Sequence, residues 1–213
     1  MDSRRTGFRI ETCSGSTGCR NRAVSTDSLG ERLESLLSEA HLAEHLDPSG
    51  AAAPHRPLIV ALAGCPNACT RPQVRDIGII GASPPVVSPE PCSECWACAE
   101  VCREEAITVD PGDGPPRIDT SRCVRCGDCH EVCPSGALTA GASGFRVMIG
   151  GRLGRHPRLA TEIPFLLTED EVIELIGACA QLYVDRREGG RRFTDVFGEA
   201  DLVRLITALV KAR

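Results

Sequence analysis

Twelve of the thirteen cysteines in this 213-residue chain stand at spacings that suit iron–sulfur ligands. An outer pattern joins a Cys-x5-Cys motif to a distant Cys-x3-Cys motif, at Cys13, Cys19, Cys65 and Cys69. An inner pattern uses Cys-x2-Cys-x2-Cys-x3-Cys twice, at Cys92, Cys95, Cys98, Cys102 and at Cys123, Cys126, Cys129, Cys133. Thiolates hold four-iron clusters in sets of four, so twelve of them predict three clusters and a chain that moves electrons.

The inner pattern resembles the bacterial two-cluster ferredoxins, in which the fourth cysteine of each run binds the other cluster. That rule predicts a first set of Cys92, Cys95, Cys98 and Cys133, and a second set of Cys123, Cys126, Cys129 and Cys102. Proline follows Cys133, as in that family, whereas Arg103 follows Cys102. Zinc is the competing metal, but zinc sites usually pair two separated CxxC knuckles. A secreted disulfide scaffold is the other alternative, and it would not reproduce two ferredoxin spacings in tandem.

Composition limits the remaining classes of function. The net charge of −5 argues against nucleic acid as a partner. No apolar run approaches the roughly 18 residues that a membrane-spanning helix needs. Residues 1–10 carry three arginines but no apolar signal core, so a cytoplasmic location is expected.

The elements that must position the cysteines can be read from hydrophobic periodicity. A helix is expected over residues 29–46, with Ser28 and Glu31 as its capping box. Short apolar runs at 58–63, 77–80 and 145–149 predict buried strands. Two further helices are expected, one beginning at Thr168 with Glu171 completing its capping box, and one over residues 200–212.

The cysteine-rich part contains an internal repeat of about thirty residues and lies between two Pro- or Gly-rich boundaries. We therefore expect an α+β, sandwich-like host domain formed by residues 1–88 and 143–213. Residues 89–142 are expected to form a two-cluster ferredoxin domain inserted into it. Cys179 falls on the apolar stripe of the helix after Thr168 and is expected to be a core residue.

The outer pattern carries a second resemblance through its flanking residues. These are Thr12-Cys13 to Cys19-Arg20, Gly64-Cys65-Pro66-Asn67-Ala68-Cys69, and the glycine- and arginine-rich loop at 150–157. Together they resemble the sirohaem–iron–sulfur domain of sulfite and nitrite reductases, over most of residues 8–200. Pro66 suits a first helical turn, which would bring Cys69 to the same side as Cys65.

That resemblance implies a third four-iron cluster on the outer four cysteines, with Cys69 bridging it to sirohaem iron. It also implies a small oxyanion substrate, sulfite or nitrite, and an electron-donor protein. Arginine forks suit both oxyanions and sirohaem carboxylates. The candidates beside the motifs are Arg20, Arg71, Arg152 and Arg155 for the substrate and Arg22 for the cofactor; the alternative for each is a solvated surface arginine.

One departure from the family leaves a second interpretation open. Only twelve residues precede Cys13, where full-length sirohaem reductases place a half-domain that contributes to the haem pocket. A partner subunit or a homo-oligomer is therefore expected to complete the site. The alternative is a haem-free electron-transfer protein that carries three clusters on the same scaffold.

Overall fold

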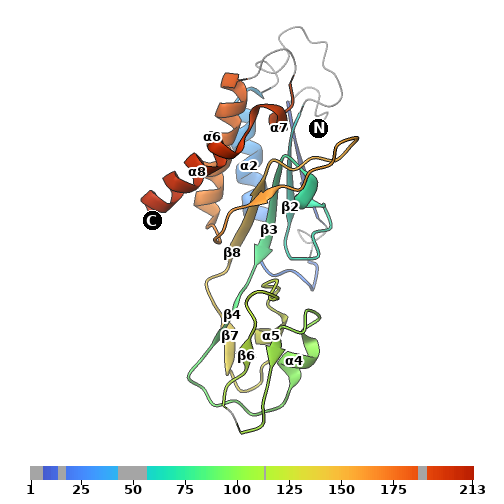
Figure 1. The fold of residues 1–213 in the computed structure, drawn as a ribbon, viewed down its shortest axis with the longest axis vertical. Helices are drawn as coiled ribbons and strands as arrows, with labels where there is room; N and C mark the ends of the chain where they lie inside the picture. The colour runs from blue at the N-terminus through green and yellow to red at the C-terminus, as the bar shows by residue number, and fades with distance from the viewer. Residues whose placement is uncertain (1–6, 14–17, 43–56, 113, 187–190) are drawn as a thin grey trace.

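The computed structural model describes residues 7–13, 18–42, 57–112, 114–186 and 191–213. It has two lobes, with a sheet and its helices forming the larger one and the cysteine-rich residues forming the smaller (Figure 1). The expected α+β, sandwich-like class is confirmed to the extent that helices pack on a mixed sheet.

The larger lobe contains a five-stranded sheet in the order β1-β2-β3-β8-β9. Strands β1 (Phe8–Thr12), β2 (Leu58–Ala63) and β3 (Ile77–Ala82) run parallel. Strands β8 (Gly144–Ile149) and β9 (Thr161–Glu162) complete the sheet by antiparallel pairing. The three strands expected at 58–63, 77–80 and 145–149 are therefore present, and they are the buried centre of the sheet.

Helices cover one face of this sheet. They are α2 (Asp27–Glu39), α6 (Glu169–Arg186), α7 (Phe193–Val196) and α8 (Glu199–Ala212). Leucines of α2 pack with Tyr183 and Cys179 of α6 against the apolar side chains of β2, β3 and β8. Cys179 is fully buried there, as expected for a core residue.

The opposite face is covered by chain without long helices. The segment between β2 and β3 crosses it and contains one short 3-10 helix, η2 (Pro72–Val74). This segment lies so close to the sheet that a Cβ on Gly78 would stand 2.3 Å from the carbonyl oxygen of Pro72. Glycine at position 78 is what allows the backbone to approach this closely.

Two helix starts test the predicted capping boxes. At α6 the box is confirmed: Glu171 N–H donates to Thr168 Oγ1 at 3.3 Å, and Thr168 N–H donates to Glu171 Oε2 at 2.8 Å. At α2 the box is wrong, because the helix already begins at Asp27 and Ser28 lies inside its first turn. The Ser28 hydroxyl instead donates to Glu169 of α6 at 2.8 Å. Residues 43–46 of that predicted helix lie outside the described residues.

The smaller lobe is the cysteine-rich segment, residues 83–143, which leaves the sheet after β3 and returns to it at β8. It contains β4 (Pro85–Val87), α4 (Ala97–Val101), β5 (Ile107–Thr108), β6 (Arg117–Ile118), α5 (Asp128–Glu131) and β7 (Leu138–Ala140). It has its own small apolar cluster around Ile107, Val109 and Leu138. Strand β4 pairs with β7 although it precedes residue 89, where the sequence placed the boundary.

The internal repeat is visible in the backbone of this segment. Positive φ angles recur at equivalent positions of the two runs, in the pairs Glu94 and Arg125, Trp96 and Gly127, Glu105 and Gly136. Each run contains a short helix, α4 or α5, and is followed by a short strand, β5 or β7. The two halves therefore fold alike in spite of their different side chains.

Candidate iron–sulfur sites

The outer cysteines gather at one edge of the sheet because β1 and β2 are parallel. Cys13 directly follows β1 and Cys65 follows β2 by two residues, so both lie at the carboxyl ends of neighbouring strands. Cys13 N–H donates to Leu62 O at 3.1 Å, and Gly64 N–H donates to Cys13 Sγ at 3.4 Å. The sheet thus fixes two members of the set from residues about fifty positions apart.

Cys65 and Cys69 are joined by successive turns, and the helical turn expected at Pro66 is wrong. Ala68 N–H donates to Cys65 O, but Ala68 then takes a φ of 51°, which ends any right-handed turn. Cys65 is buried and Cys69 is exposed. Cys69 still raises the pKa of Cys65, so the turns keep the two side chains at the same edge.

The pKa of Cys65 is affected by the thiols that lie near it. Burial raises the pKa of the Cys65 thiol, a hydrogen bond from the Asn67 backbone opposes this, and the thiols of Cys69, Cys13 and Cys19 raise it further. The structure therefore brings all four cysteines of the outer pattern together.

The inner cysteines separate into two groups according to which thiols raise one another's pKa. Burial raises the pKa of Cys98, and the neighbouring thiols that add to the rise are Cys133 and Cys92. Burial raises the pKa of Cys129 to about 12, with Cys126 and Cys123 contributing, and Cys102 acts on Cys126. These groups follow the crossed sets that the ferredoxin spacing predicts, with Cys95 of the first set exposed at the surface.

The surroundings of these thiols suit iron–sulfur clusters. Backbone N–H groups point at sulfur from Glu94 to Cys92, from Ala106 to Cys102 and from Leu138 to Cys133, at 3.3–3.4 Å. Hydrogen bonds of this kind stabilise cluster thiolates and tune their potentials. Each thiolate of a four-iron cluster binds its own iron, so the sulfurs surround a cube rather than one ion. Accordingly, among the described residues no three His, Cys, Asp or Glu side chains converge as a single-ion site.

A cavity of about 130 Å³ joins the two lobes at this point. Its wall carries the whole second set from the cysteine-rich segment, Cys102, Cys123, Cys126 and Cys129, and also Cys65 from the outer set. Asn67 and Arg125 line it as well, one from each lobe. The second set is therefore the one that faces the sheet.

A hydrogen-bonded contact holds the second set in this position. Ser83, which is 5% exposed, lies with its hydroxyl 3.0 Å from His130 Nε2 and accepts a bond from Ser143 Oγ at 3.1 Å. The Ser83 N–H donates to Arg125 O at 2.8 Å. His130 and Arg125 stand beside Cys129 and Cys126, so Ser83 is tied directly to the second set, and Ser143, just before β8, is tied to it through the Ser83 hydroxyl.

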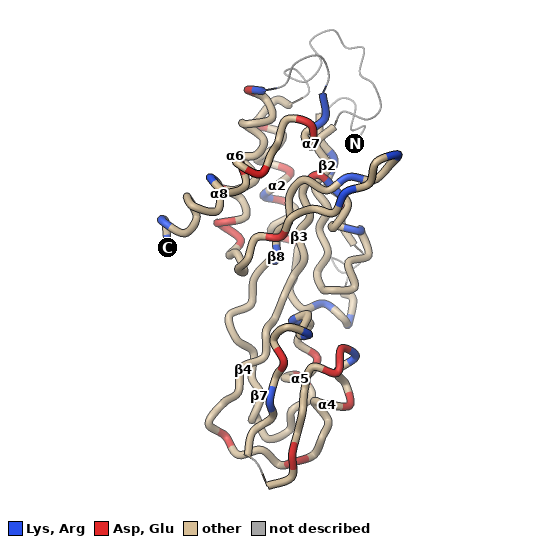
Figure 2. Tube along the Cα trace, in the orientation of Figure 1, with Lys and Arg blue, Asp and Glu red and all other residues tan. Residues whose placement is uncertain are grey.

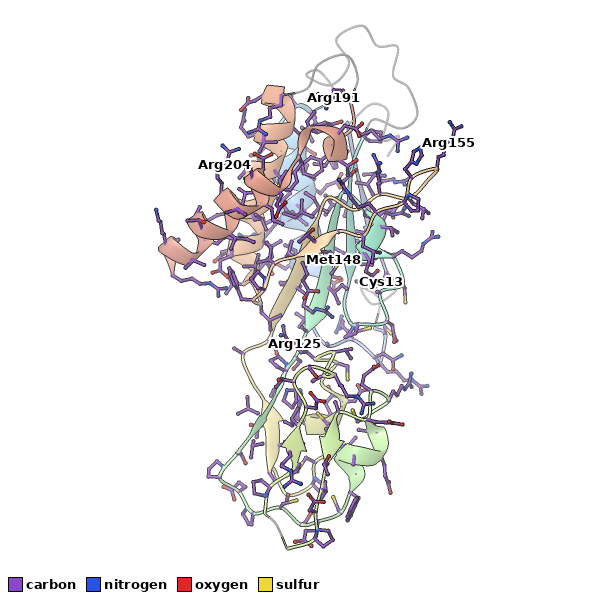
Figure 3. All side chains as sticks on the ribbon, viewed as in Figure 1. Cys13, Arg125, Met148, Arg155, Arg191 and Arg204 are labelled. Carbon is purple, nitrogen blue, oxygen red and sulfur yellow. The ribbon has the colours of Figure 1, made fainter. Side chains whose placement is uncertain are left out.

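The arginine candidates divide between the two edges of the sheet. Arg20, Arg22 and Arg71 lie near the outer cysteines, and the Arg22 side chain packs against Gly64 while pairing with Asp27 at 3.6 Å. Arg152 and Arg155 follow β8 at the opposite edge, and Figure 3 shows Arg155 at the tip of its loop, far from Cys13. The structure therefore does not bring these two arginines together with the cysteines.

Sequence reasoning missed two residues of the shared cavity, Asn67 and Arg125. Both stand inside cysteine motifs, where spacing directs attention to the ligands alone. A signal existed for Arg125, because it occupies the repeat position of Glu94 and reverses its charge. Figure 3 shows Arg125 at the junction between the lobes.

Comparison with known proteins adds three findings. Residues 6–211 match the nitrite and sulphite reductase 4Fe-4S domain. The coenzyme F420-dependent sulfite reductase of Methanocaldococcus jannaschii is 39% identical over 97 residues, which are 46% of this chain and 14% of that protein. A subunit of the anaerobic sulfite reductase of Salmonella typhimurium is 29% identical over 103 residues, which are 47% of this chain and 26% of the relative. This chain thus spans a minor part of either relative.

The fold is also found among solved structures. Dissimilatory sulfite reductase I superposes with a TM-score of 0.61 at 18% identity, covering 93% of this chain and 51% of the other. Within the part of the chain that the structure describes, no helix is long and apolar enough to cross a membrane.

Proposed function

This chain belongs to the nitrite and sulphite reductase 4Fe-4S domain family, and we propose that it is the electron-carrying portion of a sulfite reductase. Its three sets of four cysteines would each hold a four-iron cluster. The outer set would also hold sirohaem through Cys69. When bound, these groups supply one-electron transfer and the reduction of the oxyanion.

The observation that carries this proposal is the cavity shared by the second set and Cys65. Electron transfer requires the redox groups to lie close together, and here the second set and Cys65 of the outer set border one space of about 130 Å³. No cysteine of the first set lines this cavity, so electrons are proposed to arrive at the first set. Cys69 is exposed whereas Cys65 is buried, so the Cys69 sulfur is accessible to a further group.

The chain's own residues then have separate tasks. Burial of one thiol in each set, Cys65, Cys98 and Cys129, keeps water away from the metal sites. Backbone N–H groups directed at the sulfurs hold the thiolates in place. Arg20, Arg22 and Arg71 supply positive charge at the edge where the oxyanion and the sirohaem carboxylates would lie.

Sulfite is the substrate we propose, with nitrite as the family's other oxyanion. Both curated relatives are named for sulfite. The electron donor is proposed to be a protein with a basic surface, because residues 89–142 contain ten acidic and four basic side chains. Since the chain spans a minor part of those relatives, a partner subunit or second copy is proposed to complete the haem pocket.

The deciding experiment is anaerobic purification after co-expression with sirohaem synthesis. The proposal predicts about twelve irons per chain, a sirohaem absorption spectrum and sulfite-dependent oxidation of a reduced viologen. Cys69→Ser should retain the two clusters of the cysteine-rich segment and lose the sirohaem spectrum.

Three outcomes would count against the proposal in different ways. Full cluster loading without haem would reduce the function to electron transfer alone. About four irons per chain would remove the clusters proposed for the cysteine-rich segment. Stoichiometric zinc in the purified chain would exclude the whole assignment.

A further inference from the structure

A second cavity, of about 310 Å³, opens at the amino ends of the parallel strands, at the sheet edge opposite the outer cysteines. Its wall contains four arginines, which come from four different parts of the chain. Arg9 belongs to β1, Arg75 precedes β3, Arg152 follows β8 and Arg192 precedes α7. Figure 2 shows positive charge gathered beside this end of β2.

Carboxylates only partly neutralise these guanidinium groups. Glu11 pairs with Arg75 at 2.7 Å and with Arg9 at 2.5 Å, so one carboxylate serves two arginines. Arg152 reaches Asp195 at 3.4 Å. The third carboxylate in this region, Asp76, accepts a hydrogen bond from Ile59 N–H at 2.9 Å and lines the cavity. The cavity thus favours an anion.

The state of Asp76 strengthens this preference. Burial raises the pKa of its carboxyl to about 7, against the lowering effect of the Ile59 bond and of Arg192 and Arg75; Asp195 raises it further. Asp76 therefore carries only part of a negative charge at neutral pH. Four guanidinium groups then face less than three full negative charges.

Thr194 provides an independent observation that points to a ligand. It lines the cavity and is 5% exposed, yet within the described residues its Oγ1 has no hydrogen-bond partner. A buried hydroxyl without a partner is unfavourable, so such groups normally meet a protein atom, a water or a ligand. The Oγ1 atom is itself shielded from solvent, so the side chain would turn toward the cavity on binding, and an acceptor oxygen there would satisfy it.

We propose that this cavity binds a small divalent oxyanion of the sulfate class, held by Arg75, Arg152, Arg192 and the Thr194 hydroxyl. Oxyanions offer several acceptor oxygens around one centre, which matches planar guanidinium forks converging from different elements. The site lies at the opposite ends of the strands from the outer cysteines, and this proposal is independent of the proposed function. Binding would join the loop after β8, the start of α7 and the approach to β3.

The test uses the full cluster-loaded chain and sodium sulfate as the probe. Sodium chloride at matched ionic strength is the reference, and calorimetry gives the dissociation constant while thermal unfolding gives the linked stabilisation. Because sulfate also stabilises proteins through exclusion from their surface, variants decide the result. Thr194→Val and Arg192→Gln should each weaken sulfate binding about tenfold or more, as expected for loss of a hydrogen bond to an anion.

Two controls sharpen the test. Arg32→Gln removes a guanidinium from α2, away from the cavity, and should leave the dissociation constant unchanged. Sulfate does not titrate near neutrality, so its affinity should fall as the pH rises past 7 and Asp76 ionises. Asp76→Asn, which can still accept the Ile59 hydrogen bond, should keep the affinity high at about pH 8.

The proposal is overturned if calorimetry detects no sulfate binding beyond that of chloride. It is equally overturned if Thr194→Val and Arg192→Gln bind sulfate as the unaltered chain does. Loss of haem or of sulfite reduction would leave this result untouched, so the two proposals fail separately.

Discussion

The thirteen cysteines show how far residue type and spacing alone define a site. Spacing predicts crossed sets of inner cysteines, and the positive-φ positions between them bend each run in the same way. Spacing also distinguished Cys179 from the ligand cysteines, because it falls on the apolar stripe of a helix, and it is buried in the core. It could not reveal Asp76, because the environment of that carboxyl comes from β2 and α7, which are distant in sequence.

Cys102 and Cys179 give a matched test of the crossed assignment. Cys102→Ser should lose the cluster proposed for the second set, leaving about eight irons per chain, because the crossed assignment makes Cys102 its ligand from the other run. Cys179→Ala should keep all the iron, since Cys179 is fully buried in the host core. Iron and sulfide analysis with electron paramagnetic resonance of the reduced protein measures both. Equal iron contents in the two variants would refute the assignment.

Asp76 predicts an unusual pH dependence of stability. Its pKa is raised from 3.8 to about 7 in the fold, so the folded chain binds its proton more tightly than the unfolded chain. This contribution to the free energy of unfolding is complete below pH 3.8 and is lost as the pH rises to about 7. At higher pH it no longer changes.

The measurement is thermal unfolding in chloride buffers between about pH 5.5 and 8, which brackets the raised pKa. Asp76→Asn should flatten the fall in stability that the unaltered chain shows as the pH approaches 7. Asp170→Asn, which changes an exposed aspartate of α6, should keep it. A steep fall that persists in Asp76→Asn would assign the effect to other groups.

At the scale of elements, hydrophobic periodicity predicted the strands that are buried in the core. It missed the strand in which charged and apolar residues alternate. Strands β2 and β3 are apolar on both faces, and their runs were unmistakable. Strand β1 was not expected, because Arg9 and Glu11 interrupt its apolar residues. It forms because those two residues point to the sheet face where Arg75 pairs with Glu11, while Phe8 enters the core.

The close crossing of η2 over β3 makes Gly78 a sensitive position. Gly78→Ala would place a Cβ 2.3 Å from Pro72 O, so the crossing must move. We expect a loss of about 1–3 kcal/mol in the free energy of unfolding, as for overpacked cores. Chemical denaturation of the cluster-loaded chain measures it.

Gly30 in α2 is the matched control. Nothing lies within 4 Å of a Cβ at that position, and alanine favours helix formation. Gly30→Ala should therefore raise stability by about 0.5–1 kcal/mol. Equal effects at the two glycines would show that η2 does not press on the sheet.

At the scale of the whole molecule, the relation between the two lobes was beyond sequence reasoning. The sequence predicted that the cysteine-rich segment interrupts a host domain, and the chain does leave and re-enter the sheet there (Figure 1). Which cysteine set faces the host depends on the contact of Ser83 with His130 and Arg125, and no local pattern encodes it. No local pattern showed either that Arg152 lies at the end of the sheet opposite the outer cysteines, so the arginine candidates do not all gather at the cysteines.

Ser83 is the test of that contact. Ser83→Ala removes the hydroxyl between Ser143 and His130, leaving both without this partner, and should cost about 1–3 kcal/mol. It should also speed limited proteolysis at the junction between the lobes. Ser88→Ala, whose hydroxyl bonds Gly136 O inside the cysteine-rich segment, should leave the junction resistant. Resistance in both variants would mean that the lobes are held by other contacts.

The pairing of β3 with β8 has a consequence for the origin of this architecture. Ala82 and Gly144 are direct partners in the antiparallel ladder, although the whole cysteine-rich segment separates them in the chain. A tight turn could close the same two strands, so the sheet is topologically complete without the segment. A single insertion into a β-hairpin would therefore add the cysteine-rich segment to this sheet without displacing either strand. The host domain and the cysteine-rich segment would then have evolved separately before they were joined.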